Sequence, residues 1–273
     1  MAVNWVDRVP TKPGRIKITP EDGSSAWYGV MERADEPSVV GTPVNAANLN
    51  AMQRNGGLDA NITVYVAVSG SDRTGNGSST APYQTITKAL STIPKNLNGF
   101  GATINIGAGT YDEDVFIEKT FGGVINLTGD SGTQVTIRSL RVFYGSTVEI
   151  SVPITVTGAI NGNAVYVLNA TLLVGEPVVI NGTADYGVFA NRNAYCRFTY
   201  LTVNNTSIGA ITSTNLSGIS VISASGSNNT VGYRVTDGGV IVYINNSLTA
   251  NTLYQSQTGG RIYSGSQTSI PNY

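Results

Sequence analysis

The sequence contains no histidine, only one cysteine and few charged residues, and each scarcity excludes a class of protein. Without histidine there is no Ser-His-Asp triad, no imidazole base and no use of the commonest metal ligand. The single Cys196 excludes an internal disulfide framework and a zinc site built on cysteines. Charged residues make up 12% of the chain and its net charge is −1, which argues against nucleic acid or an anionic membrane as a partner.

One short motif recurs every 21 to 23 residues through the second half of the chain. Its copies are Arg141–Tyr144, Ala164–Val167, Gly187–Ala190, Gly209–Thr212, Gly232–Val235 and Leu253–Ser256. A period of this length is typical of solenoids, in which each copy is too short to form a core and stacks on its neighbours.

One copy of the repeat divides into three short strands. Val165–Val167, Thr171–Val174 and Val178–Ile180 are rich in β-branched residues and are separated by turn residues. The pattern predicts an all-β fold, a right-handed parallel β-helix with three strands per rung and about seven to eight rungs. Asn181 and Asn204 would then stack at one corner and bond through their amides. A β-sandwich is the alternative, since turns every 8–12 residues fit it too, but it gives no reason for a repeat near 22.

The chain divides into four predicted segments. Residues 1–60 contain both tryptophans, two expected strands at Ile16–Thr19 and Ala26–Val30, and a short helix after Asn45. Residues 61–101 hold a linker strand and a helix between Pro82 and Pro94 that is expected to cap the first rung. The β-helix is expected over 102–264, starting with a first rung at Ala102, and residues 265–273 form a C-terminal tail.

Three N-terminal motifs resemble the attachment region of a known family. Pro13–Pro20, Glu32–Pro37 and Gly41–Asn45 are similar to the N-terminal region of tail fibre and tail spike proteins from phages and prophages of Gram-positive bacteria. The order of strand, Gly-Ser-Asp loop, short helix and first rung from Val64 onward resembles the opening of pectate-lyase-like β-helix domains. The resemblance implies that residues 1–60 dock onto a phage tail or baseplate. The docking residues expected from it are Trp5, Arg15, Trp27, Tyr28, Arg33 and Asp35.

The same resemblance implies the partners and the location. Tail spikes of this architecture are usually homotrimers, and three copies would give avidity for weak contacts with a host cell-surface glycan. No signal peptide and no run of about 20 apolar residues occurs in the sequence. We therefore expect the protein in the virion, extracellular after host lysis, with no membrane insertion, no nucleic-acid partner and no cofactor.

Alternation along the recurring strand predicts an outward column of side chains. Tyr166, Phe189, Ile211 and Arg234 would point away from the core, and Val188 would point into it. Adjacent apolar residues on the outside of a solenoid call for a partner. The partner is either a neighbouring subunit or a glycan stacked on the aromatic rings. A register one residue different would exchange the two faces.

The alternative function is that of a glycan depolymerase, a hydrolase or lyase, because pectate-lyase-like folds include enzymes. Hydrolases of this class place two or three carboxylates about 5–9.5 Å apart. The one dense acidic group is Asp112, Glu113, Asp114 and Glu118, expected in a turn after the first rung. Asp185 and Asp237 are the other possible acid pair. Because neither set is expected to converge, we predict no catalytic residue, no metal site and no enzymatic activity.

Overall fold

The computed structural model describes residues 57–182 and 184–265, together with the backbone of 15–18 and 27–30. The chain forms two units, Met1–Gly56 and Gly57–Tyr273. In the first unit, β1 (Arg15–Ile18) pairs antiparallel with β2 (Trp27–Val30), with Arg15 opposite Val30. This pair confirms the two strands predicted there.

The predicted docking residues are only partly within the described chain. Arg15, Trp27 and Tyr28 lie in β1 and β2. Trp5, Arg33, Asp35 and the helix expected after Asn45 lie outside the described residues.

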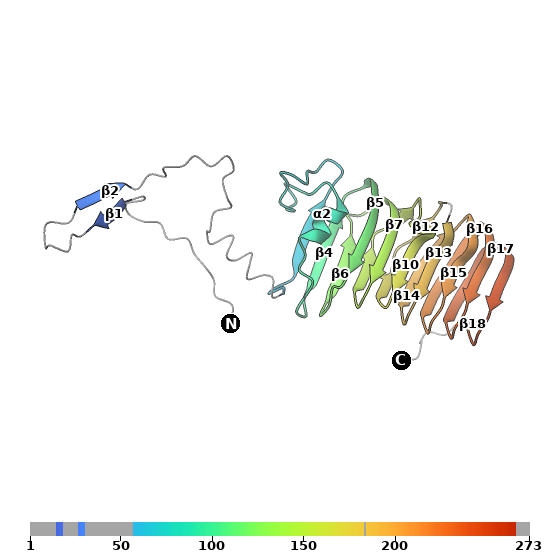
Figure 1. Ribbon diagram of the computed structural model, residues 1–273. Helices are drawn as coiled ribbons and strands as arrows, with labels where there is room; N and C mark the ends of the chain where they lie inside the picture. Colours follow the sequence, from blue (N-terminus) through green and yellow to red (C-terminus); the bar gives the residue numbers. More distant parts are fainter. Residues whose placement is uncertain (1–14, 19–26, 31–56, 183, 266–273) are drawn as a thin grey trace. The chain divides into compact units, whose positions relative to one another are not determined.

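The second unit is a parallel β-solenoid of about 7 turns, which confirms the predicted fold class (Figure 1). Its strands form three columns, here called faces A, B and C, in which each strand pairs with strands one coil away. Face A comprises β3 (Ile62–Val66), β4 (Gly101–Ile106), β6 (Val124–Thr128), β8 (Thr147–Ser151), β11 (Thr171–Val174), the first parts of β14 (Tyr195–Val203), β16 (Gly218–Val235) and β17 (Val240–Ser256), and β18 (Arg261–Ser264).

The other two faces share several of these strands, which bend at the corners. Face B comprises the first parts of β5 (Gly109–Glu118) and β7 (Val135–Phe143), β9 (Ile154–Val156), β12 (Val178–Ile180), the end of β14 and the middle of β16 and β17. Face C comprises the last parts of β5, β7, β16 and β17, with β10 (Asn163–Leu168), β13 (Ala184–Asn191) and β15 (Thr206–Ser213).

The core runs through the solenoid as stacked columns of apolar side chains. In β4, Ala102, Ile104 and Ile106 are buried and alternate with more exposed residues, as expected for a strand with one face inward. Val165, Val188, Ile211 and Tyr233 form one such column on face C, each paired with the next. Burial of each large side chain stabilises the fold by about 1.5–3 kcal/mol.

The predicted outward position of Ile211 is wrong, because Ile211 is in the core and has 0% exposure. A bulge causes the difference: Ala184 pairs with Thr206, whereas Tyr186 pairs with Gly209. Between these two pairs, β15 therefore contains one residue more than β13 does. Thr212 takes the outward position, between Phe189 and Arg234. The inward position of Val188 is confirmed.

Asparagine stacks at the corners as predicted. The Asn204 side-chain amide donates to Asn181 Oδ1 at 3.5 Å, and Asn228 donates to Asn205 Oδ1 at 3.2 Å. Asn205 and Asn228 have φ of 61° and 58°, a left-handed conformation that asparagine tolerates better than most residues. These contacts hold successive corners in register.

The predicted capping helix is confirmed as α2 (Ile86–Ser91), which packs on β3, β4 and β5 at one end of the stack (Figure 1). The helix residues Ile86 and Ala89 are buried, and Ile93, just after the helix, belongs to the same core. The Thr85 hydroxyl caps the helix by accepting a hydrogen bond from the Lys88 backbone at 3.0 Å. The strand predicted as a linker is not separate: β3 pairs in parallel with β4 and begins face A before the predicted first rung.

Candidate functional site

The outward side chains of face C form a continuous row along the stack, here called the face C row. It consists of Phe116, Arg141, Tyr166, Phe189, Thr212, Arg234 and Gln255, each in register with the next. Three of the four residues predicted for this surface, Tyr166, Phe189 and Arg234, belong to the row, and Ile211 does not.

Aromatic rings dominate the first half of the row. Tyr166 packs against Phe189 with ring centroids 5.2 Å apart, and against Phe143 at 4.9 Å. Phe189 also stacks on Tyr186 at 4.6 Å, and Phe143 contacts Phe116 at 5.2 Å. Phe116 is 43% exposed. The rings therefore form one connected cluster on face C, in which Phe116 is exposed, Phe143 is buried and Tyr166, Tyr186 and Phe189 are partly exposed.

Polar groups in the row have incomplete bonding. Arg141 donates through Nη2 to the Ile160 carbonyl at 2.7 Å, but its buried Nε has no partner in the described part of the chain. The Thr212 side chain is fully buried, and its hydroxyl likewise has no partner among the described residues. Arg234 donates to Gln255 Oε1 at 2.9 Å. A buried polar atom without a partner costs about 1–3 kcal/mol of stability, so the Thr212 hydroxyl destabilises the fold at this point of the row.

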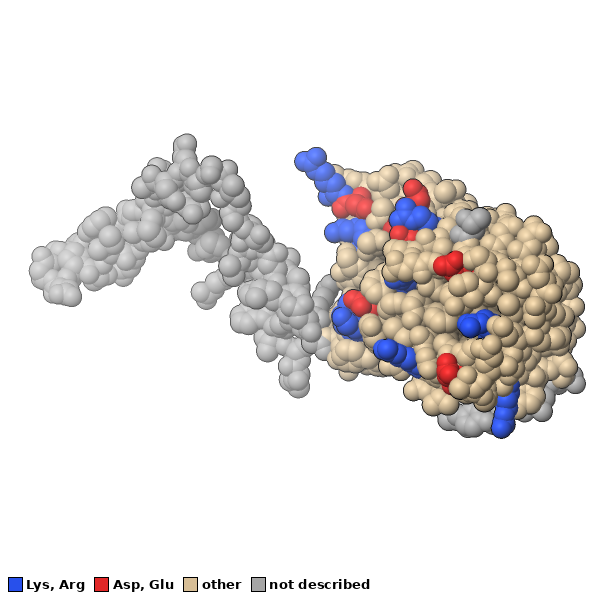
Figure 2. All heavy atoms as spheres, turned by 45° about the vertical axis from the view of Figure 1, so that its right-hand side comes forward, with Lys and Arg blue, Asp and Glu red and all other residues tan. Residues whose placement is uncertain are grey.

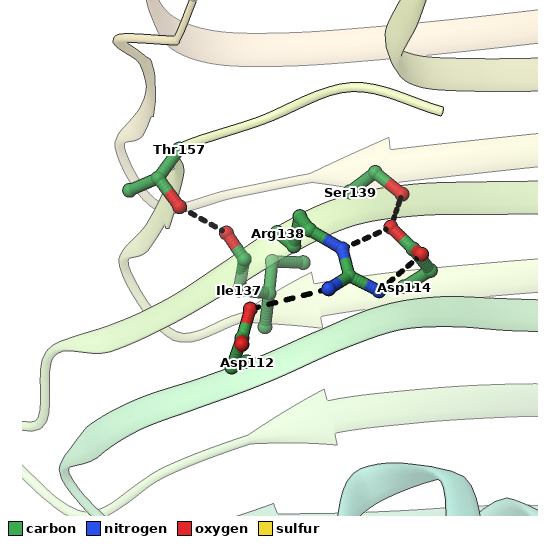
Figure 3. A network of polar contacts seen from close by, with 6 residues as sticks. All are labelled: Asp112, Asp114, Ile137, Arg138, Ser139 and Thr157. Atoms are coloured by element: carbon green, nitrogen blue, oxygen red, sulfur yellow. Dashed lines mark hydrogen bonds and ion pairs between the residues drawn. The ribbon is translucent and has the colours of Figure 1, made fainter. Parts of the chain in front are cut away.

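Two residues of the dense acidic group, Asp112 and Asp114, are bonded to Arg138 on the surface of the solenoid (Figure 3). Arg138 donates to both oxygens of Asp114, at 3.0 and 2.5 Å, and to Asp112 at 3.4 Å. The Ser139 hydroxyl donates to Asp114 at 2.6 Å. The hydrogen bond from Arg138 lowers the pKa of Asp114, and Ser139 lowers it further although burial opposes both. This carboxylate is therefore an ion-pair partner and is poorly suited to donate a proton.

The third carboxylate of the group points to the helix. Glu113 accepts hydrogen bonds from the backbone of Ile86 and Thr87, at 2.9 and 2.8 Å, and so satisfies free N–H groups at the start of α2. The predicted turn at 112–114 is wrong, because these residues lie within β5, where Asp112 and Glu113 form a bulge between Tyr111 and Asp114. The bulge sends neighbouring carboxylates to different partners.

Asp72 supports the same end of the helix from the loop after β3. Its Oδ1 accepts from the backbone of Gln84 and Thr85, at 2.8 and 3.0 Å, and its Oδ2 accepts from the Thr85 hydroxyl at 2.7 Å. Burial raises the pKa of Asp72, but these hydrogen bonds outweigh it and leave the pKa below its usual value.

The other candidate acids, Asp185, Asp237 and Glu118, do not contact one another. Asp185, in β13 at the start of face C, accepts from the Ser207 hydroxyl at 2.6 Å. Asp237 follows β16 at the other end of face C and accepts from Thr214 at 3.2 Å. Glu118 lies 3.7 Å from Lys119 Nζ. Within residues 57–182 and 184–265, no group of three acidic, cysteine or histidine residues could hold a metal ion.

Cys196 is buried in the core, as expected for a packing residue. Burial raises the pKa of its thiol, which disfavours the reactive thiolate.

Two shallow hollows open on the surface. One, of about 520 Å³, lies where face B turns into face C, and Asp185, Asn205, Ser207 and Asn228 line it. The other, of about 440 Å³, lies on face B and is here called the face B groove. Its lining is Pro177, Tyr200, Leu201, Thr202, Ser223, Ala224, Ser225, Asn245, Asn246 and Ser247.

Sequence reasoning missed the face B groove. Tyr200 is its most prominent side chain, with 53% exposure. The sequence signal that could have indicated the groove is the repeat spacing: Tyr200 lies 23 residues before Ser223, with which it pairs. The strands that carry these residues bend through two faces, so their outward residues cannot be recognised from the strand at the motif alone.

Comparison of the chain with protein-family models, with curated proteins and with solved structures gave no match. Among the described residues, no helix has the length and apolar character needed to cross a membrane.

Proposed function

We propose that this chain is a structural and receptor-binding protein of a phage or phage-derived tail. In this proposal the N-terminal unit docks onto the tail or baseplate, and the solenoid contacts glycan on the host surface. The observation that carries the proposal is the pairing of a β-solenoid with connected aromatic rings along the first half of the face C row. The resemblance of residues 13–45 to tail attachment regions supports the tail assignment.

The face C row supports assembly into a homotrimer. Connected aromatic rings on the outside of a solenoid are the kind of surface that another subunit covers. The charged side chains of the row are Arg141 and Arg234, and the chain as a whole carries few charges: on the side shown in Figure 2, scattered charged side chains are separated by wide uncharged areas. Three copies would multiply weak contacts with a repetitive surface.

The bonding of the acidic group supports a role other than glycan cleavage. Asp112 and Asp114 bond to Arg138, whereas Glu113 bonds to the start of α2. Cleavage by two carboxylates needs both to face one glycosidic bond. The carboxylates in β5 are engaged in holding a strand and a helix together.

The proposal is tested with the purified full-length chain. We expect a trimer in sedimentation equilibrium and binding to intact Gram-positive cells from a panel of species, without release of oligosaccharides from their wall polysaccharide. A monomer that binds none of these cells would contradict the proposal. Release of oligosaccharides would favour the depolymerase instead.

A further inference from the structure

The face B groove runs between two columns of outward side chains. In one column Tyr200 pairs with Ser223, and Ser223 pairs with Asn245. In the other, Thr202 pairs with Ser225, and Ser225 with Ser247. Pro177 lies beside Tyr200, because the next residue, Val178, pairs with Leu201. One end of the groove is therefore apolar, formed by Pro177 and Tyr200, and the coils that follow present hydroxyl and amide groups.

No charged side chain lines this groove. The tyrosine ring offers an apolar face and a phenol, and in the described part of the chain nothing bonds to the Tyr200 hydroxyl. Thr202 and Ser225 share one hydrogen bond of 2.8 Å, which leaves one O–H donor on the accepting hydroxyl and acceptor lone pairs on both. The lining suits a ligand that carries apolar C–H faces, many hydroxyls and no charge.

We propose that the face B groove binds an uncharged oligosaccharide, with one sugar ring packed on Tyr200. This rests on the proposed function, for which it specifies the binding face and the chemical class of the glycan. Glu176, directly before Pro177, is exposed at the rim, and its carboxylate disfavours an anionic chain. The groove has no arginine or lysine to compensate an acidic sugar.

The ligand runs along the stack of coils. Successive outward residues in each column are one coil apart, about 4.8 Å. This is comparable to the length of one pyranose unit, so that consecutive sugars meet Tyr200, Ser223 and Asn245. The groove is shallow, so a single site binds weakly and several copies are needed for tight attachment.

The test uses the full-length protein and a glycan array. The array carries uncharged glucose-, galactose- and N-acetylglucosamine-based oligosaccharides beside oligosaccharides that contain uronic acids. Wild type is compared with Tyr200→Ala, Tyr200→Trp and Tyr263→Ala. Tyr263 is the matched control, because it is a tyrosine of similar exposure, 47%, in β18 on face A, outside the groove.

We expect binding to at least one uncharged oligosaccharide and to none of the acidic ones. Tyr200→Ala should weaken that binding roughly tenfold, because truncating an aromatic anchor removes a large share of the binding energy of a contact surface. Tyr200→Trp should keep the binding, because it keeps the ring, and Tyr263→Ala should bind as wild type does. Circular dichroism confirms that each variant is folded.

Three results would overturn the inference: unchanged binding by Tyr200→Ala, binding to acidic oligosaccharides alone, or no binding to any uncharged one. Adsorption of the same proteins to Gram-positive cells separates this inference from the proposed function. If wild type and Tyr200→Ala adsorb equally, the groove assignment fails and the proposed function stands. If wild type binds the array through Tyr200 but adsorbs to no cell, the proposed function fails and the groove assignment stands.

Discussion

Replacing Ile211 by alanine and Thr212 by valine should change stability in opposite directions. Ile211 is fully buried between Val188 and Tyr233, and three carbon groups leave the core in Ile211→Ala. At about 0.8 kcal/mol per group the transfer term is about 2.4 kcal/mol, and the cavity raises the total to about 3–4 kcal/mol. The neighbouring Thr212→Val keeps the shape and removes a buried hydroxyl without a partner. It should stabilise the protein by about 1 kcal/mol.

The assay is urea unfolding of the full-length chain followed by circular dichroism. Solenoids can unfold in parts, so amide hydrogen exchange in β13, β15 and β16 provides a local measure. Ile208→Ala is the matched control, since Ile208 lies in the same strand and is 38% exposed. It should cost less than about 1 kcal/mol. A loss at Thr212→Val larger than the loss at Ile211→Ala would refute the register and the argument built on it.

Three further predictions concern assembly, pH and catalysis. Phe189→Asp should break the trimer into monomers or aggregates in light scattering, whereas Phe121→Asp, which alters an exposed ring outside the row, should leave it intact. The pKa of Asp72 is lowered in the folded state, so its stabilisation of α2 is fully present above the unfolded pKa of about 3.9 and is lost as pH falls through the folded pKa. Asp72→Ala should lower the free energy of unfolding by about 1 kcal/mol at pH 7. In thermal melts the variant should also lose less stability than the wild type as the pH is lowered below about 4. Glu113→Gln combined with Asp114→Asn should leave cell adsorption unchanged, and the wild type should release no oligosaccharide; cleavage that the double variant loses would reverse the assignment.

The sequence period was sufficient to predict the solenoid, because stacking requires similar coils at similar spacing. The capping helix was predictable as well, since Ile86, Leu90 (or Ala89) and Ile93 have helical spacing between two prolines, and Ile86 and Ala89 are the buried residues of the helix. The register of Ile211 was not predictable from the period. An extra residue in one coil leaves the repeat length almost unchanged, and only the strand pairing shows where the bulge is.

The acidic stretch illustrates a second limit. Three consecutive acidic residues are typical of a solvated turn, but two of them, Asp112 and Asp114, bond to Arg138, which follows Asp114 by 24 residues. An ion pair between coils depends on the register, which a single sequence does not give. The face B groove was missed for the same reason, because Tyr200 and Ser225 come from different coils.

The parallel stacking of coils also determines how the solenoid responds to force. The hydrogen bonds between strands lie along the stacking direction, so a pull on Gly57 and Gly265 loads the bonds between one coil and the next. The end with α2 is closed by the buried side chains of Ile86 and Ala89, whereas at the other end, among the residues that the structure describes, β18 pairs only with the face A part of β17. Rupture should therefore begin at the C-terminal coil and proceed coil by coil. Each coil of about 22 residues would release roughly 75 Å of chain, so that the protein lengthens in steps and absorbs a load before its capped end opens.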